Sequence, residues 1–220
     1  MIRHVFWDWN GTLLADTLLS VHAVEATLAS LGLSIPVTVE RWRDVATRPV
    51  EVSFRALIGH DLTLPQWHAA EDAYLDAYVA GVAEVGLTPG ALDALTRLRE
   101  AGLSQSIVSL HPQDALEADI ARLGVAHHFG TIAGRGPVGS HGGFPDKADL
   151  VREQAGLLGV DVGRTVLIGD MVDDATSAHR AGAQGVLVAT GDTSRERLVA
   201  SGFPVVDTLA EAVEWVLARV

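Results

Sequence analysis

The sequence predicts an α/β fold: a Rossmann-like parallel sheet core with an inserted α-helical cap. Short apolar runs alternate with longer segments of helical periodicity, and one stretch of about 70 residues has helical patterns without a convincing strand. Continuous apolar strands separated by helices are typical of a parallel sheet that is covered on both faces.

Four apolar runs are interpreted as buried strands, because each holds four or five strand-forming residues bounded by turn or polar residues. They are Ile2–Phe6, Ser106–Leu110, Arg164–Ile168 and Gly185–Ala189. The capping box Thr208–Glu211 predicts the start of a last helix. In a parallel sheet ligands bind at the carboxyl ends of the strands, so the polar residues that follow these runs are the candidate site.

The segment from Ala15 to Gly86 interrupts the alternation of strands and helices. It contains helical patterns from Val21 to Leu31 and from Trp67 to Val85. We expect a core domain made of residues 1–14 and 87–220, and a helical cap domain made of residues 15–86.

Composition excludes several classes of protein. The formal net charge of −12 argues against binding to nucleic acid or to an anionic membrane, and the absence of cysteine excludes disulfides and cysteine-ligated metals. No apolar run reaches the roughly 18 residues of a membrane span. The first eight residues do not form the apolar stretch of a signal peptide. We expect a cytoplasmic protein, monomeric or homodimeric, with no nucleic-acid or membrane partner.

Asp8 ends the first predicted strand and is followed by Trp9-Asn10-Gly11-Thr12. Asn-Gly between apolar runs is also a common hairpin signal. The next segment, Leu18 to Leu31, has helical periodicity, however, so no partner strand follows. A carboxylate at a strand end before a glycine loop suits a nucleophile that faces a phosphate held by backbone N–H groups.

Three further residues lie near the ends of predicted strands or the starts of helices. Ser109 could cap a helix or donate to a phosphoryl oxygen. Lys147 is the only lysine among 16 basic residues, which favours a need for a compact ammonium over an ordinary surface charge. Asp170 could simply favour a helix N-terminus, but next to Asp8 its charge would be costly without a cation, and magnesium binds such carboxylates.

In the order Asp-x-Asn-Gly-Thr, Ser, Lys, Gly-Asp-x-x-x-Asp, these motifs resemble the haloacid dehalogenase (HAD) superfamily over nearly the whole chain. The resemblance extends to Thr88–Gly102, which is similar to the helix after an inserted cap, and to Ala178–Gly182 after the acidic motif. It implies a phosphatase-like hydrolase with a helical C1-type cap, similar to the phosphoglycolate-phosphatase branch.

The resemblance also implies residue roles. Asp8 would attack phosphorus and form an aspartyl-phosphate, on a small phosphorylated metabolite that the cap selects. The transferred group would be held by Gly11, Thr12, Ser109, Leu110 and Lys147. A Mg²⁺ ion would be bound by Asp8, the carbonyl of Asn10, Asp170 and Asp174, with Asp173 as the alternative to Asp174.

Asn10 departs from the family pattern, in which a second aspartate protonates the leaving oxygen and later activates water. An amide does neither, and acid–base catalysis contributes roughly 10²–10⁴ in rate. The substrate could have a good leaving group, such as an acyl or aryl phosphate, or a histidine could substitute, either His111 or His22. Otherwise the chain is a catalytically weak phospho-ligand-binding or regulatory protein. Arg48, in a predicted cap loop, is a candidate substrate contact.

Other chemistries fit less well. The family's dehalogenases lack a full magnesium site, whereas Asp170 and Asp174 are present here. The family's phosphonate cleavage needs a cap lysine, and residues 15–86 contain none. Receiver domains carry similar residues in a different order and in about half this length.

Overall fold

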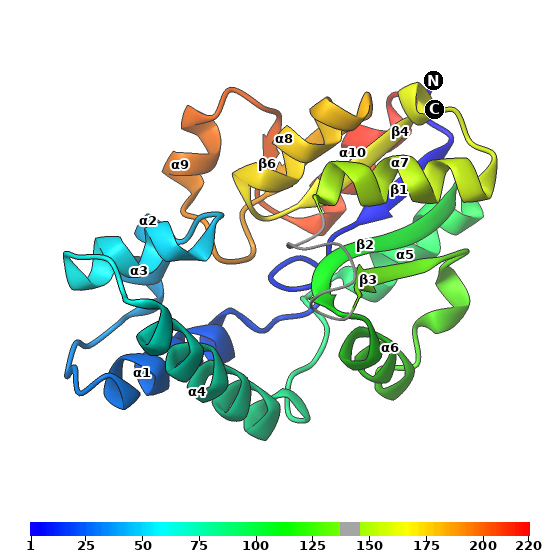
Figure 1. Ribbon diagram of the computed structural model, residues 1–220. Helices are drawn as coiled ribbons and strands as arrows, with labels where there is room; N and C mark the ends of the chain where they lie inside the picture. The colour runs from blue at the N-terminus through cyan, green and yellow to red at the C-terminus, as the bar shows by residue number, and fades with distance from the viewer. Residues whose placement is uncertain (137–145) are drawn as a thin grey trace.

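The structure is a computed structural model that describes residues 1–136 and 146–220. Within these residues the sheet has six parallel strands in the order β3-β2-β1-β4-β5-β6 (Figure 1). The strands are β1 (His4–Trp7), β2 (Ser104–Pro112), β3 (Ile132–Arg135), β4 (Thr165–Gly169), β5 (Gln184–Val188) and β6 (Val205–Val206).

Helices cover both faces of the sheet. One face packs against α5 (Ala91–Glu100), α6 (Gln113–Arg122) and α10 (Leu209–Leu217), and the other against α7 (Lys147–Leu158) and α8 (Val172–Ala181). Helix α9 (Arg195–Ala200) lies on the α8 side through Leu198. Short 3₁₀ turns occupy Ala126–His128 and Val162–Arg164.

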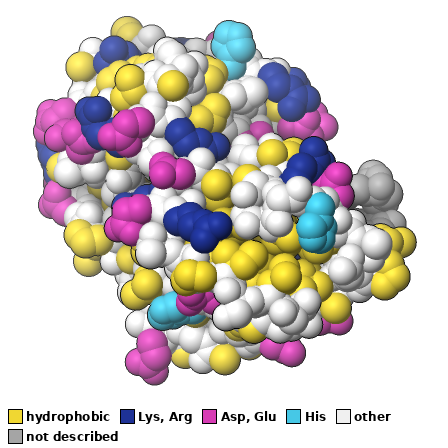
Figure 2. All heavy atoms as spheres, turned by 90° about the vertical axis from the view of Figure 1, so that its left-hand side faces the viewer, with side chains coloured by type: hydrophobic (Ala, Val, Ile, Leu, Met, Phe, Trp, Pro, Cys, Tyr) yellow, Lys and Arg dark blue, Asp and Glu magenta, His cyan; other side chains and the backbone are white. Residues whose placement is uncertain are grey.

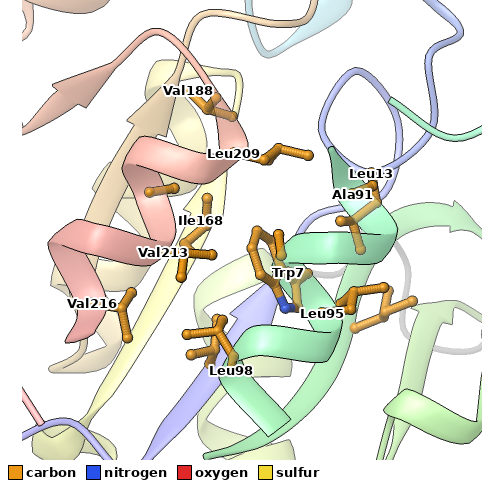
Figure 3. Packing of buried hydrophobic residues seen from close by; sticks show 14 of the residues in the cluster. Trp7, Leu13, Ala91, Leu95, Leu98, Ile168, Val188, Leu209, Val213 and Val216 are labelled. Atoms are coloured by element: carbon orange, nitrogen blue, oxygen red, sulfur yellow. The ribbon is translucent and has the colours of Figure 1, made fainter. Parts of the chain in front are cut away.

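Successive residues of the central strand point to opposite faces, as the pleat requires. Val5 and Trp7 join the cluster with α5 and α10, whereas Phe6 joins the cluster with α7 and α8. Trp7 lies between α5 and α10 (Figure 3), and its indole N–H donates to Gln105 at 2.9 Å. The buried indole is therefore both packed and hydrogen-bonded, which fixes the base of the strand that carries Asp8.

Residues 15–86 contribute four helices and no strand. The helices are α1 (Thr17–Ser30), α2 (Val39–Val45), α3 (Val50–Ile58) and α4 (Leu64–Val82). They form a group beside the sheet (Figure 1) with a hydrophobic cluster of their own, in which Trp42 is buried and Trp67 packs against it. Figure 2 shows the side of the molecule on which this group lies, where acidic and basic side chains are scattered among apolar ones.

The predicted α/β class and parallel sheet are confirmed. The four predicted strands are present with ends shifted by one or two residues, and Thr208 caps α10 by accepting from the backbone N–H of Glu211. Strands β3 and β6 were not predicted, since β6 has two residues and β3 includes Gly134. Among the described residues, no helix combines the length and apolar character needed to cross a membrane.

Candidate active site

The predicted strand ends meet at one edge of the sheet. Trp7 is in register with Ile107 of β2 and Ile168 of β4. The next residue, Asp8, donates its backbone N–H to the carbonyl of Ile168 at 2.9 Å. Asp8 and Asp170 therefore follow neighbouring strands, and Ser109 lies near the end of the third.

Lys147 is the first residue of α7, and its buried side chain crosses to this edge. Its Nζ contacts Asp8 Oδ1 at 2.7 Å and also contacts Asp174 Oδ1. Burial alone would lower the pKa of Lys147, but the charges of Asp174 and Asp8 outweigh it and raise the pKa. The lysine is therefore charged at any physiological pH, and it bridges two carboxylates.

Asp8, Asp170 and Asp174 form a buried cluster in which one oxygen of each lies within 4.8 Å of the others. Burial raises the pKa of Asp8 to about 6 despite Lys147, and burial together with neighbouring carboxylates raises that of Asp170. Burial disfavours the charged form of each carboxyl group, and the neighbouring carboxylates add repulsion to that cost. Carboxylate oxygens that converge in this way fit a hard divalent cation, which would relieve the repulsion.

Two glycines make room for Asp170. A Cβ on Gly11, whose φ is +70°, would lie 2.5 Å from Asp170 Oδ2, and a Cβ on Gly191 would lie 2.0 Å from the same oxygen. The Asp170 carboxylate also accepts from the backbone N–H of Asp192 at 2.6 Å and from the Thr12 hydroxyl at 3.1 Å. Its position is thus fixed by contacts on several sides.

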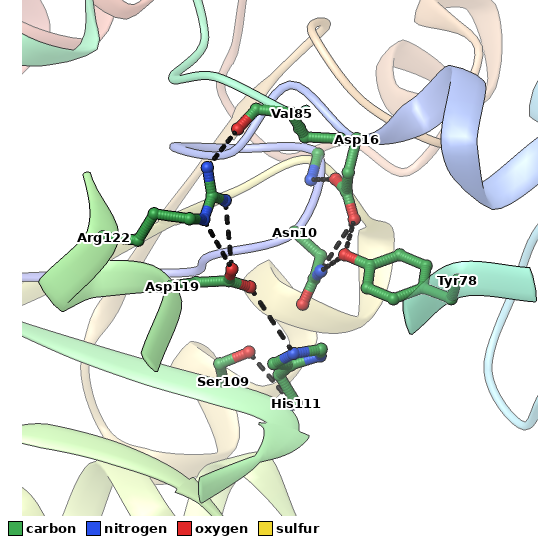
Figure 4. A network of polar contacts seen from close by, with 9 residues as sticks. Asn10, Asp16, Tyr78, Val85, Ser109, His111, Asp119 and Arg122 are labelled. Carbon is green, nitrogen blue, oxygen red and sulfur yellow. Dashed lines mark hydrogen bonds and ion pairs between the residues drawn. The ribbon is translucent and has the colours of Figure 1, made fainter. Parts of the chain in front are cut away.

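Asn10 belongs to a closed triangle of hydrogen bonds (Figure 4). Its amide nitrogen donates to Asp16 Oδ2 at 2.7 Å and to the Tyr78 hydroxyl at 2.8 Å. The Tyr78 hydroxyl in turn donates to Asp16 Oδ2 at 2.6 Å. Both hydrogens of the Asn10 amide are therefore used, and Oδ1 remains as an acceptor.

The loop amides at Gly11 and Thr12 are engaged within the protein. Gly11 N–H donates to Asp16 Oδ1 at 2.7 Å, and Thr12 N–H donates to the carbonyl of Trp9 at 3.3 Å. Their predicted contacts with a phosphate would require these bonds to change, and those roles stay predictions. Ser109 is buried, and its Oγ accepts from the backbone N–H of His111 at 3.1 Å, so its own hydrogen is available to donate. Leu110 is half-buried beside it.

His111 lies next to the Asn10 triangle. Its ring centroid is 5.8 Å from that of Tyr78, and its Nε2 is 3.9 Å from Asp119 Oδ2. Arg122 binds the other oxygen of Asp119 at 3.0 Å. Burial lowers the pKa of His111 below its usual value, against the charges of Asp119 and Asp16.

The other predicted residues lie further from this centre. His22 is exposed on α1, and none of the contacts above involves it. Asp173 is half-buried, whereas its neighbour Asp174 contacts Lys147. Burial raises the pKa of Asp173, and the charges of Lys147 and Arg48 oppose the rise. Arg48 is exposed, and its predicted contact with a substrate stays a prediction.

Sequence reasoning missed Asp16, Tyr78 and the loop Thr190–Asp192. The loop joins the site to α2, since the Arg43 guanidinium donates to the carbonyls of Gly191 at 2.7 Å and Thr190 at 3.2 Å. The Thr190 hydroxyl also donates to the Gly11 carbonyl at 2.8 Å. The position of this loop in the sequence could have indicated its role, because polar residues that follow the strand Gln184–Val188 lie at the same edge of the sheet.

Known proteins resemble the chain in sequence and in fold. An N-acetylmuramic acid 6-phosphate phosphatase of Pseudomonas aeruginosa is 28% identical over 86% of this chain and 83% of its own. A phosphoglycolate phosphatase of Mesorhizobium japonicum is 29% identical over 87% and 84%. A predicted phosphatase from Clostridium acetobutylicum shares the fold, with a TM-score of 0.83, 21% identity and 99% coverage of both chains.

A family profile supports the same assignment. Residues 5–188, which include Asp8, Ser109, Lys147 and Asp170, match the profile described as haloacid dehalogenase-like hydrolase. The match spans most of the six-stranded sheet and all four helices of residues 15–86. The chain belongs to the haloacid dehalogenase-like hydrolases.

Proposed function

We propose that the protein is a magnesium-dependent phosphatase that transfers the phosphoryl group of a small metabolite to Asp8 and then to water. The observation that carries this proposal is the buried contact of Lys147 with both Asp8 and Asp174, beside Asp170. Phosphoryl transfer depends on positioning and charge neutralisation, and this arrangement supplies both.

Asp8 is the nucleophile in this proposal. Its pKa of about 6 leaves the carboxylate mainly ionised at neutral pH, and Lys147 holds Oδ1. Attack on phosphorus breaks the bond to the leaving oxygen and forms an aspartyl-phosphate. Ser109 donates its hydroxyl hydrogen to a phosphoryl oxygen, and Lys147 offsets the charge on the transferred group.

Asp8, Asp170 and Asp174 would hold the magnesium ion, together with the backbone carbonyl of Asn10. When bound, the ion supplies positive charge to the phosphoryl oxygens. The hydrogen bonds from Asp192 and Thr12 to Asp170 keep that carboxylate aimed at the cluster.

Residues 15–86 act as the cap that closes over this edge. Their hydrophobic cluster is separate from those of the sheet, and Arg43 and Tyr78 carry their contacts to the loops of the site. Closure excludes water from the reacting groups, and cap residues such as Arg48 choose the substrate.

The relatives act on alkyl phosphates by name, N-acetylmuramic acid 6-phosphate and phosphoglycolate. Asn10 offers no proton to an alkoxide leaving group, because an amide is not acidic enough, and its two hydrogens are also bound to Asp16 and Tyr78. We therefore infer that this chain prefers acyl or aryl phosphates, whose leaving groups depart as stable anions.

The test is a panel of acyl, aryl and alkyl phosphates, including the two named substrates, assayed with and without Mg²⁺. We expect turnover of acyl and aryl phosphates that is abolished by chelator and by Asp8→Asn. Metal-independent turnover contradicts the proposal. Binding of phosphorylated ligands with no turnover of any of them would instead establish the phospho-ligand-binding alternative.

A further inference from the structure

The second half of the proposed reaction requires a base, and Asn10 is unable to serve as one. Its amide is held by Asp16 Oδ2 at 2.7 Å and by the Tyr78 hydroxyl at 2.8 Å. Reversing the amide would place its oxygen against the Asp16 carboxylate. The Tyr78 hydroxyl already donates its hydrogen to Asp16, so it could not compensate. The Asn10 side chain is therefore fixed with its amide oxygen as an acceptor, and an amide oxygen is too weak a base to take a proton from water.

His111 is a titratable side chain beside that position. It lies two residues after Ser109 on β2, and its backbone N–H donates to Ser109 Oγ. Its ring is 5.8 Å from the Tyr78 ring, centroid to centroid, and its side chain is 13% exposed. In Figure 4 the Asn10 side chain, Ser109 and His111 come from neighbouring segments at one end of the sheet. A role as base requires the ring to act on the space that Ser109 borders, directly or through one water.

The surroundings of His111 suit a base, because a nearby carboxylate stabilises the imidazolium that forms when the ring accepts a proton. Asp119 on α6 faces Nε2 at 3.9 Å, and Arg122 holds the other oxygen of Asp119 while donating to the carbonyl of Val85 at 2.9 Å. This anchoring keeps a carboxylate beside the ring without placing it in a tight ion pair.

The charges around the ring come from several elements. Asp119 and Asp16 favour the protonated imidazole, whereas Arg135 at the end of β3 disfavours it. Tyr78 on α4 is neutral, because burial raises the pKa of its hydroxyl. Burial outweighs the two carboxylates and lowers the pKa of His111, so the ring is neutral at pH 7. A neutral imidazole accepts a proton readily and has none to give without becoming an anion, which makes it a base and not an acid.

We propose that His111 is the general base that activates water against the aspartyl-phosphate on Asp8, with Asp119 as its positioning residue. The water oxygen bonds to phosphorus, its proton passes to a ring nitrogen of His111, and the bond from phosphorus to the Asp8 oxygen breaks with its electron pair left on the carboxylate. The imidazolium, opposite Asp119, then returns the proton to solvent. This inference rests on the proposed function and adds a base without an acid, which restricts the enzyme to leaving groups that depart unprotonated.

The experiment compares the wild type with His111→Gln and with a matched control, His68→Gln, at an exposed histidine on α4. p-Nitrophenyl phosphate with Mg²⁺ is mixed rapidly with each protein, and nitrophenol release and intact mass are followed together. For His111→Gln we expect a stoichiometric first release as fast as in the wild type, a steady rate lowered roughly 10²-fold or more, and accumulation of the phosphoenzyme. The control should match the wild type.

Two outcomes overturn the proposal. A first release slowed as much as the steady rate places His111 in the first half of the reaction. An increase in KM at unchanged kcat makes it a substrate contact only. Turnover that survives Asp8→Asn refutes the proposed function itself, and is thus distinguishable from failure of this inference.

A second variant, Asp119→Asn, keeps the test decisive if His111→Gln does not fold. Removing the carboxylate makes the imidazolium less stable, so phosphoenzyme breakdown should be slower and its pH profile should move to lower pH, while the first release is unchanged. A pH profile of breakdown that Asp119→Asn leaves in place contradicts the inference.

Discussion

The buried side chain of Lys147 donates from Nζ to Asp8 Oδ1 at 2.7 Å. The only lysine of the chain therefore neutralises the carboxylate that follows β1. The same ammonium contacts Asp174. A compact ammonium fits between two carboxylates, whereas a planar guanidinium presents a wider fork.

Lys147→Arg should therefore lower kcat even though the charge is kept. Charge-assisted contacts of this kind contribute about 1.5–3 kcal/mol, so we expect a loss of roughly 10- to 100-fold. The matched control is Arg55→Lys, an exchange at the exposed ion pair with Asp61, which should leave activity unchanged. Full activity of Lys147→Arg would show that charge alone is needed.

The convergence of Asp8, Ser109 and Asp170 could be predicted from the strand pattern of the sequence, whereas only the family resemblance placed Lys147 beside Asp8. The apolar runs fix which residues are buried strands, and parallel strands all end at one edge of a sheet. The family resemblance then assigned catalytic roles to residues for which the sequence pattern alone allowed either a structural or a functional interpretation.

The partners of Asn10 could not be predicted in this way. Tyr78 meets Asp16 from 62 residues away along the chain. Tyr78 is one of two buried residues of α4, and the packing of α4 on α1 decides that its hydroxyl reaches a loop of the site. Strand β6 was not predicted for a related reason. Its two residues are too few to show a hydrophobic pattern, and their pairing with β5 is set by tertiary structure.

Magnesium should stabilise the fold through the carboxylate cluster. If the folded cluster binds the ion as proposed, the melting temperature of the wild type should rise with Mg²⁺ concentration. Asp170→Asn should abolish that rise and, without metal, melt at or above the wild-type temperature, since it removes one of three repelling carboxylates. Thermal unfolding with and without chelator measures both effects. An unchanged magnesium response in the variant would exclude Asp170 as a ligand.

The metal-free protein should show a pH dependence that comes from Asp8. Burial raises the pKa of Asp8 from 3.8 to about 6, so between these values the folded state binds more protons than the unfolded state. Stability from this group therefore rises as pH falls from about 7 to 4, by an amount on the order of 1–3 kcal/mol.

Protonation of a buried histidine lowers the stability as pH falls, which opposes the effect of Asp8. The contribution of Asp8 is therefore measured as the difference in stability between the wild type and Asp8→Asn. The pKa of His4 is lowered by burial to about 4, and its protonation destabilises the fold as pH falls below 6.5. Subtracting the denaturation profile of Asp8→Asn from that of the wild type cancels this common effect. A difference that is flat across this range would mean that Asp8 titrates normally.

Gly191→Ala should weaken metal binding without replacing a metal ligand. The added Cβ would lie 2.0 Å from Asp170 Oδ2, so the carboxylate must move away from the cluster. We expect the Mg²⁺ concentration for half-maximal activity to rise by roughly tenfold or more, the range seen when supporting contacts of a metal ligand are lost. Gly86→Ala, where a Cβ meets nothing within 4 Å, is the matched control and should behave as the wild type.

Asn10→Asp should change which phosphates are hydrolysed. A carboxylic acid at this position can protonate an alkoxide leaving group, a contribution of roughly 10²–10⁴ in rate. Aryl phosphates need no such proton, so kcat/KM should increase far more for phosphoglycolate than for p-nitrophenyl phosphate. Equal increases for both substrates would show that the missing acid does not limit the natural protein.

The central claim is a phosphoryl group on Asp8, and trapping it tests that claim most directly. The protein is mixed with Mg²⁺ and an acyl phosphate, quenched within the first turnover and treated with borohydride, which reduces an aspartyl-phosphate to homoserine. Peptide sequencing by mass spectrometry should then find homoserine at position 8 and an unmodified Asp170 and Asp174. Phosphate recovered on another side chain, or turnover with aspartate intact at position 8 throughout, would contradict the account.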